Sequence, residues 1–376
     1  MNRKILTLTI TIILFLSSAV YASAAYDEMF SGQLESSGAD ELCEYLSEET
    51  LEYMEKLGFG DLDYEKILNV SPISVFKLVG GMIKDGFSAP LKGMMKATGA
   101  VLLISVVSGF FPDDEKSRAV LNIACGSFVI ISVLSDATNA VRSAAGAIGA
   151  CAEFEKALIP VLAAMLTVGG NPISALSVKG AAFAAAQTIE WLAGDAVLPL
   201  VGISSALNLC GAVLPTLRLS AVGDIIRKTA TTVLGASAGL FSGFLCLKSV
   251  VSSRADSLAV KGVKMASGTF IPVIGGALGE IYSTFSASIS LLKSTVGIYA
   301  VVAFFVIGTP VVVNLAMWSI SMKASSAISD LLDCRQCSEV LKNIGFIFSF
   351  MNVILILCIT VFTVTAGICV MIKNGG

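Results

Sequence analysis

Histidine is absent from this sequence of 376 residues. It is the commonest general base near neutral pH and a frequent metal ligand, so Ser-His, Cys-His and histidine-zinc chemistries have no candidate residue. The sequence also contains no phosphate-binding loop of the G-x-x-x-x-G-K-[ST] type. We therefore expect no enzymatic activity, no nucleotide hydrolysis, no cofactor or metal, and no nucleic acid partner.

Charge is also scarce. Charged residues make up 14% of the chain, whereas ordinary soluble domains contain about 25%. Hydrophobic residues reach 55%, and the mean hydropathy is +0.84. This composition excludes an ordinary water-soluble domain and predicts an all-α polytopic transmembrane protein in contact with the lipid bilayer.

The cysteines do not form a recognisable framework. The chain has nine of them, mostly within apolar stretches, where a free thiol behaves as a small hydrophobic group. Cys334-Arg335-Gln336-Cys337 is a C-x-x-C sequence, but no second pair and no histidine completes a metal site. We interpret it as a plain loop or helix-end pair rather than a redox motif.

Residues 1–24 have the pattern of a cleavable signal peptide. Arg3 and Lys4 form a positive region, residues 5–16 are apolar, and Ala22-Ser23-Ala24 has the small-residue pattern of a cleavage site. The alternative is an uncleaved anchor helix, although the apolar region is short for a span. Both interpretations predict that the segment after it is exported.

Residues 25–70 form an acidic segment, since 13 of the 28 Asp and Glu residues lie between Asp27 and Glu65. Apolar residues at three- and four-residue spacings predict an amphipathic helix there, giving a small extracytoplasmic N-terminal head. Its apolar face either packs on a partner or on the rest of the chain, or the segment is a solvated leader. The next stretch, 71–96, mixes apolar residues with lysines and predicts an interfacial amphipathic helix.

Residues 97–376 predict a polytopic transmembrane domain of about seven or eight segments, some broken or re-entrant. The seven strong candidates are the uncharged runs 97–112, 119–135, 157–178, 196–217, 229–247, 294–322 and 343–372, and a weaker eighth is 180–193. Basic residues flank the run at 229–247 on both sides. Either that run is re-entrant, or one flanking connection departs from the positive-inside rule.

Three glycines share one helical face within the run at 229–247: Gly235, Gly239 and Gly243. In lipid, a flat face of small residues permits close approach of two helices, so the triplet predicts a helix-packing interface within the chain or between copies of it. The alternative is chance, because the chain contains 34 glycines.

Helix breaks and polar residues supply the conduit candidates. The sequence Gly169-Gly170-Asn171-Pro172 predicts a broken helix, with Asn171 and Pro172 either lining a path or simply ending a span. Glu190 is a functional candidate, because a carboxylate in lipid usually faces a bundle interior. We slightly favour a second interpretation, in which Glu190 lies near a membrane surface beside the interface aromatic Trp191.

Two adjacent segments carry a family resemblance. Lys264-Met-Ala-Ser-Gly-Thr-Phe-Ile-Pro-Val-Ile-Gly275 and Ser290-Leu-Leu-Lys-Ser-Thr-Val-Gly-Ile298 resemble the signature region of the stage III sporulation protein AE family. The signal, acidic head and polytopic body resemble that family over essentially the whole chain. In physical terms, Phe270 and Pro272 place a helix breaker after a basic stretch and before Gly275, which predicts either a re-entrant elbow or a lipid-surface helix.

The resemblance implies a role in endospore development. Members of the family are expected in the mother-cell membrane around the forespore, as multi-pass subunits of a secretion-like feeding channel built with other stage III sporulation proteins, including a separate ATPase. We therefore expect a channel subunit that acts by assembly, with conduit lining as a further role and homo-oligomerisation as one mode of assembly. The alternative is a stand-alone secondary transporter or permease, for which the sequence offers no convincing internal repeat.

Overall fold

The computed structural model describes residues 32–60, 72–110, 115–213, 219–268 and 275–371. These residues are almost entirely helical and contain no strand, which confirms the all-α prediction for this part of the chain. In chain order the elements are the 3-10 helix η1 (Asp40–Tyr45), α2 (Glu48–Lys56), α4 (Pro72–Gly86), α5 (Ser88–Ser108), α6 (Glu115–Val168), α7 (Pro172–Trp191), the π-helix η2 (Leu192–Val197), α8 (Leu198–Val213), α9 (Leu219–Gly268), α10 (Gly275–Leu331) and α11 (Arg335–Met371).

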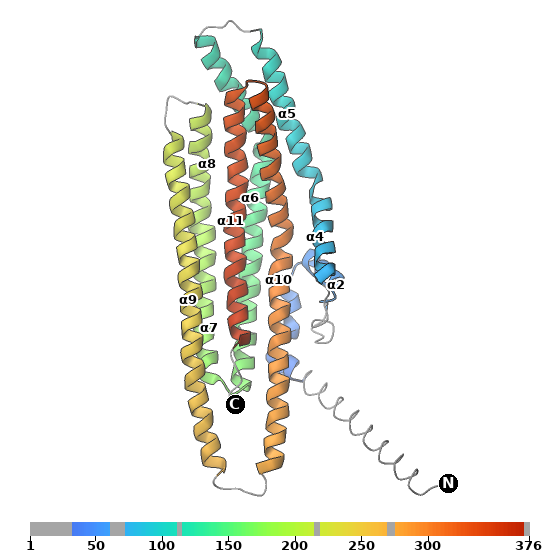
Figure 1. Ribbon diagram of the computed structural model, residues 1–376, viewed down its shortest axis with the longest axis vertical. Coiled ribbons are helices and arrows are strands. Elements are labelled where there is room, and N and C mark those ends of the chain that lie inside the picture. The colour runs from blue at the N-terminus through green and yellow to red at the C-terminus, as the bar shows by residue number, and fades with distance from the viewer. Residues whose placement is uncertain (1–31, 61–71, 111–114, 214–218, 269–274, 372–376) are drawn as a thin grey trace, which may run out of the picture.

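The long helices run alternately in opposite directions and form an antiparallel bundle (Figure 1). α11 lies inside it and packs against α10, α6, α9, α8 and α7. Phe304 on α10 contacts Phe154 on α6 and Phe362 on α11, with ring centroids 5.3 and 5.7 Å apart. All three phenylalanines are fully buried, so they mark the apolar centre where these helices meet.

Several helices are much longer than one membrane crossing. α6, α9 and α10 contain 54, 50 and 57 residues, which at 1.5 Å per residue makes them about 75 to 86 Å long. The hydrocarbon core of a bilayer is about 30 Å thick. Each of these helices therefore extends well beyond the length that a single crossing requires.

Five stretches of the described chain are long and apolar enough to cross a membrane: Lys77–Ser108, Ile123–Val168, Pro172–Ala212, Ala287–Leu331 and Arg335–Ile368. The predicted seven or eight segments are not reproduced. The runs at 119–135 and from 157 onward lie on the single helix α6, and 180–193 and 196–217 lie along α7, η2 and α8. Charged residues separate the apolar runs in the sequence. Lys, Arg and Glu are nevertheless good helix formers, so the backbone helix continues through them.

The predicted interfacial helix at 71–96 is divided in the structure. α4 ends at Gly86, and α5 begins at Ser88 and continues into the apolar run. Both helices pack against α10. The boundary between them therefore falls inside the predicted segment, and whether α4 lies at a lipid surface stays a prediction.

The described part of the acidic head, residues 32–60, is folded against the bundle. Ser47 caps α2 by accepting a hydrogen bond from the Thr50 backbone N–H. η1 packs on α6, and α2 packs on α10. Cys43 Sγ lies 3.2 Å from the Tyr299 hydroxyl oxygen, and the Ser288 hydroxyl donates to Gln33 Oε1 over 2.8 Å. Of the two expectations, the structure matches packing on the rest of the chain.

Candidate functional site

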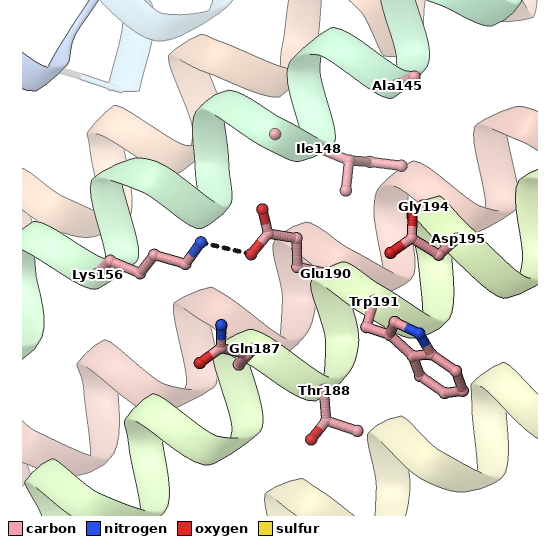
Figure 2. Close-up of a pocket in the computed structure, with 10 residues that line it drawn as sticks. Ala145, Ile148, Lys156, Gln187, Thr188, Glu190, Trp191, Gly194 and Asp195 are labelled. Carbon is pink, nitrogen blue, oxygen red and sulfur yellow. Dashed lines mark ion pairs between the residues drawn. The ribbon is translucent and has the colours of Figure 1, made fainter.

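A polar cavity of about 720 Å³ lies between α6 and the α7–η2 segment. Figure 2 shows the side chains that line it, with α6 forming one wall and α7 and η2 the other. Its polar residues are Lys156, Gln187, Thr188, Glu190 and Asp195. Small residues on both walls leave the space open, namely Ala145, Gly149 and Gly194.

An ion pair crosses this cavity. Lys156 Nζ on α6 lies 2.5 Å from Glu190 Oε2 on α7, and about a third of each side chain is exposed. In Figure 2 the two side chains point toward each other from facing helices. The pair gives the carboxylate a counter-charge and ties α6 to α7, although its partial exposure means that water screens it.

Glu190 therefore lies in a cavity between helices, paired with Lys156. Trp191 beside it also lines the cavity, and 57% of its surface is exposed. The exposed ring fits the interface-aromatic interpretation, whereas the paired carboxylate fits the interpretation as a cavity residue.

The π-helix η2 shapes the cavity wall. Pro199 has no backbone N–H, so it cannot donate the α-helical hydrogen bond to the carbonyl of Asp195 four residues earlier. A local π turn, with its i to i+5 pattern, is compatible with this missing donor and places Gly194 and Asp195 at the cavity. π turns inside helices occur frequently at functional sites, which adds weight to this region as a candidate site.

The cavity contains the chemistry of a binding site. A cation, two carboxylates, an amide and a hydroxyl can hold a small polar or zwitterionic group, or a polar side chain of another protein. We therefore regard it as a candidate interaction site.

Asn171 and Pro172 lie far from this cavity along α7, in the turn that joins α6 to α7. Gly170 has φ +79°, and Pro172 is the first residue of α7. The Asn171 side chain is buried and its amide donates to the Gly169 carbonyl over 3.2 Å. The break is therefore a tight turn between two helices, which is the simpler of its two interpretations.

The glycine triplet lies on an open face of α9. A Cβ added at Gly235, Gly239 or Gly243 would meet nothing within 4 Å. The described part of the chain therefore places no helix in close contact with this face. An interface between this glycine face and another chain stays a prediction.

The predicted elbow lies mostly outside the described residues, because Phe270 and Pro272 fall in the segment 269–274. Gly275 is the first residue of α10. α9 on the other side is one helix over Leu219–Gly268, so the run at 229–247 is not re-entrant. The two basic flanks of that run therefore lie at different heights along one helix.

The C-x-x-C pair lies at the turn between α10 and α11. Both thiols are free, and Cys337 is fully buried. Burial raises the pKa of the Cys334 thiol, and nearby Asp333 raises it further, against a hydrogen bond with Ser105. A thiol held in its protonated form is a poor nucleophile, which agrees with a structural role.

Sequence reasoning missed Glu155. It precedes the apolar run at 157–178 and was not among the intramembrane candidates, yet only 1% of its surface is exposed. Its burial could have been predicted from its helical spacing to Cys151, Leu158 and Leu162, which lie on the same buried face of α6.

Comparison with known proteins places this architecture in a family. A family model described as stage III sporulation protein AE matches residues 72–373. The Stage III sporulation protein AE of Bacillus subtilis (strain 168) is 24% identical over 272 residues, covering 71% of this chain and 68% of that protein. No solved structure shows a significant match. Because the family model spans α4 to the end of α11, this chain belongs to the stage III sporulation protein AE family.

Proposed function

We propose that this protein is a membrane subunit of a multiprotein channel between mother cell and forespore, and that it acts by assembling with other stage III sporulation proteins. The observation that carries the proposal is the family match over the whole helical bundle, residues 72–373. The five membrane-compatible helices support a multi-pass location. The membrane concerned is the mother-cell membrane around the forespore.

Two surfaces suit assembly. The first is the cavity between α6 and α7, where the Lys156–Glu190 pair and Asp195 offer both signs of charge to a partner. The second is the open glycine face of α9, where a second copy or a companion helix can approach closely. Lining of the conduit is a further role, with the polar cavity as the part of this chain that faces the path.

Energy for transport comes from a partner in this proposal. The sequence has no phosphate-binding loop, so a separate ATPase of the same complex supplies nucleotide hydrolysis. The acidic head, residues 25–70, lies outside the cytoplasm in the space between the two membranes. The described part of the head, residues 32–60, packs against α6 and α10, which supports a role in presenting the bundle to partners on that side.

The rival function is a stand-alone secondary transporter. The observation that favours it is the ion pair within a polar cavity between membrane-compatible helices, because ionisable residues of that kind mark substrate and ion pathways. A transporter of this class binds its substrate without companion proteins. A channel subunit therefore needs companion proteins in order to act, whereas a stand-alone transporter does not.

Affinity purification from sporulating cells distinguishes them. We expect a tagged full-length protein to recover other stage III sporulation proteins, the ATPase among them, after mild solubilisation. An unrelated tagged polytopic protein from the same cells is the control and recovers none of them. If the tagged chain is recovered alone and moves a solute into proteoliposomes by itself, the channel-subunit proposal is wrong and the transporter is right.

A further inference from the structure

Glu155 is a carboxyl group in the interior of the bundle. It lies on α6 between Phe154 and Leu158, both fully buried, and 1% of its own surface is exposed. α6 packs there against α7, α10 and α11. Cys151, one turn earlier on α6, interacts electrostatically with both Glu155 and Cys358 of α11. Glu155 therefore lies on the buried face of α6, one helical turn from Cys151.

This carboxyl has an unsatisfied oxygen and no counter-charge. Glu155 Oε2 is buried without a hydrogen-bond partner. Among the described residues, no lysine or arginine nitrogen forms an ion pair with it. Lys156 is next in sequence, but it pairs with Glu190 of α7. The cation of this region is thus already engaged elsewhere.

An ionised carboxylate in such a place is costly. Removing an unpaired charge from water costs far more free energy than burying a neutral polar group. Removing one partner of a buried ion pair is strongly destabilising for the same reason. A protonated carboxyl avoids the charge, and its O–H can rotate toward neighbouring acceptors. The nearby residues Cys151, Phe154 and Leu158 on α6 are fully buried and uncharged, and Phe304 of α10 packs on Phe154, so the surroundings favour the neutral group.

We propose that Glu155 is a proton-binding site in the core of the bundle. At rest the carboxyl holds its proton and is buried in the interior of the bundle, in which α6 packs against α11. Release of that proton to water leaves a carboxylate, and the negative charge favours states in which α6 and α11 separate enough to admit water. Proton occupancy is thereby coupled to the packing of the two helices, whether or not this chain lines a conduit.

Infrared spectroscopy of the full-length protein in lipid nanodiscs tests this proposal. We expect a carbonyl stretching band of a protonated carboxyl in apolar surroundings at neutral pH, shifted in D2O and lost in Glu155→Gln. Glu153→Gln is the matched control, because Glu153 lies two residues earlier on the same helix and is exposed. That variant should keep the band.

The proposal is overturned if the wild-type protein shows no such band at neutral pH, or if Glu155→Gln and wild type have identical bands. Should Glu155→Gln fail to fold, the wild-type band itself decides: it must disappear as the pH is raised. A second readout is labelling by dicyclohexylcarbodiimide, a lipophilic reagent for protonated carboxyls. Peptide mapping should find the adduct on Glu155 and a loss of labelling at high pH, and an adduct on Glu153 instead contradicts the proposal.

Discussion

Close contacts at individual glycines determine how the N-terminal helices sit on the bundle. Gly93 on α5 lies directly against the Trp318 indole of α10, and a Cβ built there overlaps the ring. Trp318 in turn stacks on Phe348 of α11, with centroids 5.4 Å apart. Thr98 and Ser325 continue the α5–α10 contact with hydroxyl oxygens 3.2 Å apart. The absence of a side chain at Gly93 is thus a packing requirement.

We expect Gly93→Ala to lower the free energy of unfolding by about 1 to 3 kcal/mol, because a methyl group overpacks the contact with Trp318. Thermal unfolding in detergent, followed by circular dichroism, measures the change. Gly99→Ala on the same helix is the control, since its added Cβ meets nothing within 4 Å. That control should be neutral or slightly stabilising, and equal effects of the two variants would contradict the packing argument.

At the scale of elements, the α6–α7 pair is joined by charge as well as by packing. The Lys156–Glu190 pair lies beside the π-helix η2, where the ordinary helical hydrogen-bond pattern is interrupted. We expect the Lys156–Glu190 ion pair to fix the position of α7 along α6 at the point where η2 begins. Its strength is limited because both side chains remain partly in contact with water.

A double-mutant cycle measures this link. We expect Lys156→Met and Glu190→Gln each to destabilise the fold slightly, with a coupling of about 0.2 to 1 kcal/mol between them. The exchange Lys156→Glu with Glu190→Lys should restore most of the loss. High salt should reduce the coupling, because a partly exposed pair is screened. A coupling of zero at low salt would show that the pair does not tie the helices together.

The open glycine face of α9 gives a second prediction at this scale. We expect Gly239→Leu to leave the thermal unfolding of the isolated chain unchanged, because nothing lies within 4 Å of an added Cβ. The same variant should lose co-purifying partners and reduce spore formation, because a leucine prevents close helix approach.

Gly202→Leu on α8 is the matched control for that variant, since its added Cβ also meets nothing within 4 Å and no glycine triplet surrounds it. It should keep both partners and spore formation. Retention of partners by Gly239→Leu would remove the glycine face from the assembly.

At the scale of the whole molecule, the connections sort into two ends (Figure 1). α5, α8 and α10 end, and α6, α9 and α11 begin, at one end of the bundle, and the α6–α7 turn and the C-terminal end of α11 lie toward the other. Basic residues lie close in sequence to the first of these ends: Lys116 and Arg118 near the start of α6, Arg218 immediately before α9, and Arg335 at the start of α11. The positive-inside rule predicts that this end is cytoplasmic.

Reporter fusions test the resulting topology. We expect alkaline phosphatase to be active when fused after Asn69 and after Gly376, and inactive when fused after Asp333 in the α10–α11 turn, where a fluorescent cytoplasmic reporter should work instead. The physical reasons are the basic links at the Asp333 end and the docking of the head on Ser288 and Tyr299, far along α10 from that turn. Activity after Asp333 would reverse the orientation.

The C-terminal part of α9 is the exception to the positive-inside rule in this topology. Lys261 and Lys264 lie there on α9, at the opposite end of the bundle from the α10–α11 turn. The conflict between the sequence and the positive-inside rule arises because α9 is one continuous helix with basic residues on both sides of its apolar run.

Composition alone determined that the described chain is helical, with stretches long and apolar enough to cross a membrane. Long apolar stretches with little charge suit a membrane interior, where every backbone N–H and C=O must be satisfied internally, and a helix does this within one segment. The sequence also singled out Glu190 and the glycine triplet, because a carboxylate and a GxxxG repeat in apolar surroundings can be read locally.

Only the tertiary structure decided the partners of these residues. Burial and pairing depend on which helix faces which, and hydropathy does not contain that information. Glu190 faces Lys156 across a cavity, Glu155 faces the interior beside α11, and the glycine face of α9 stays open because no helix of the described chain covers it. For the same reason the apolar runs merged into fewer, longer helices, since a helix continues through charges that its neighbours or water can accommodate.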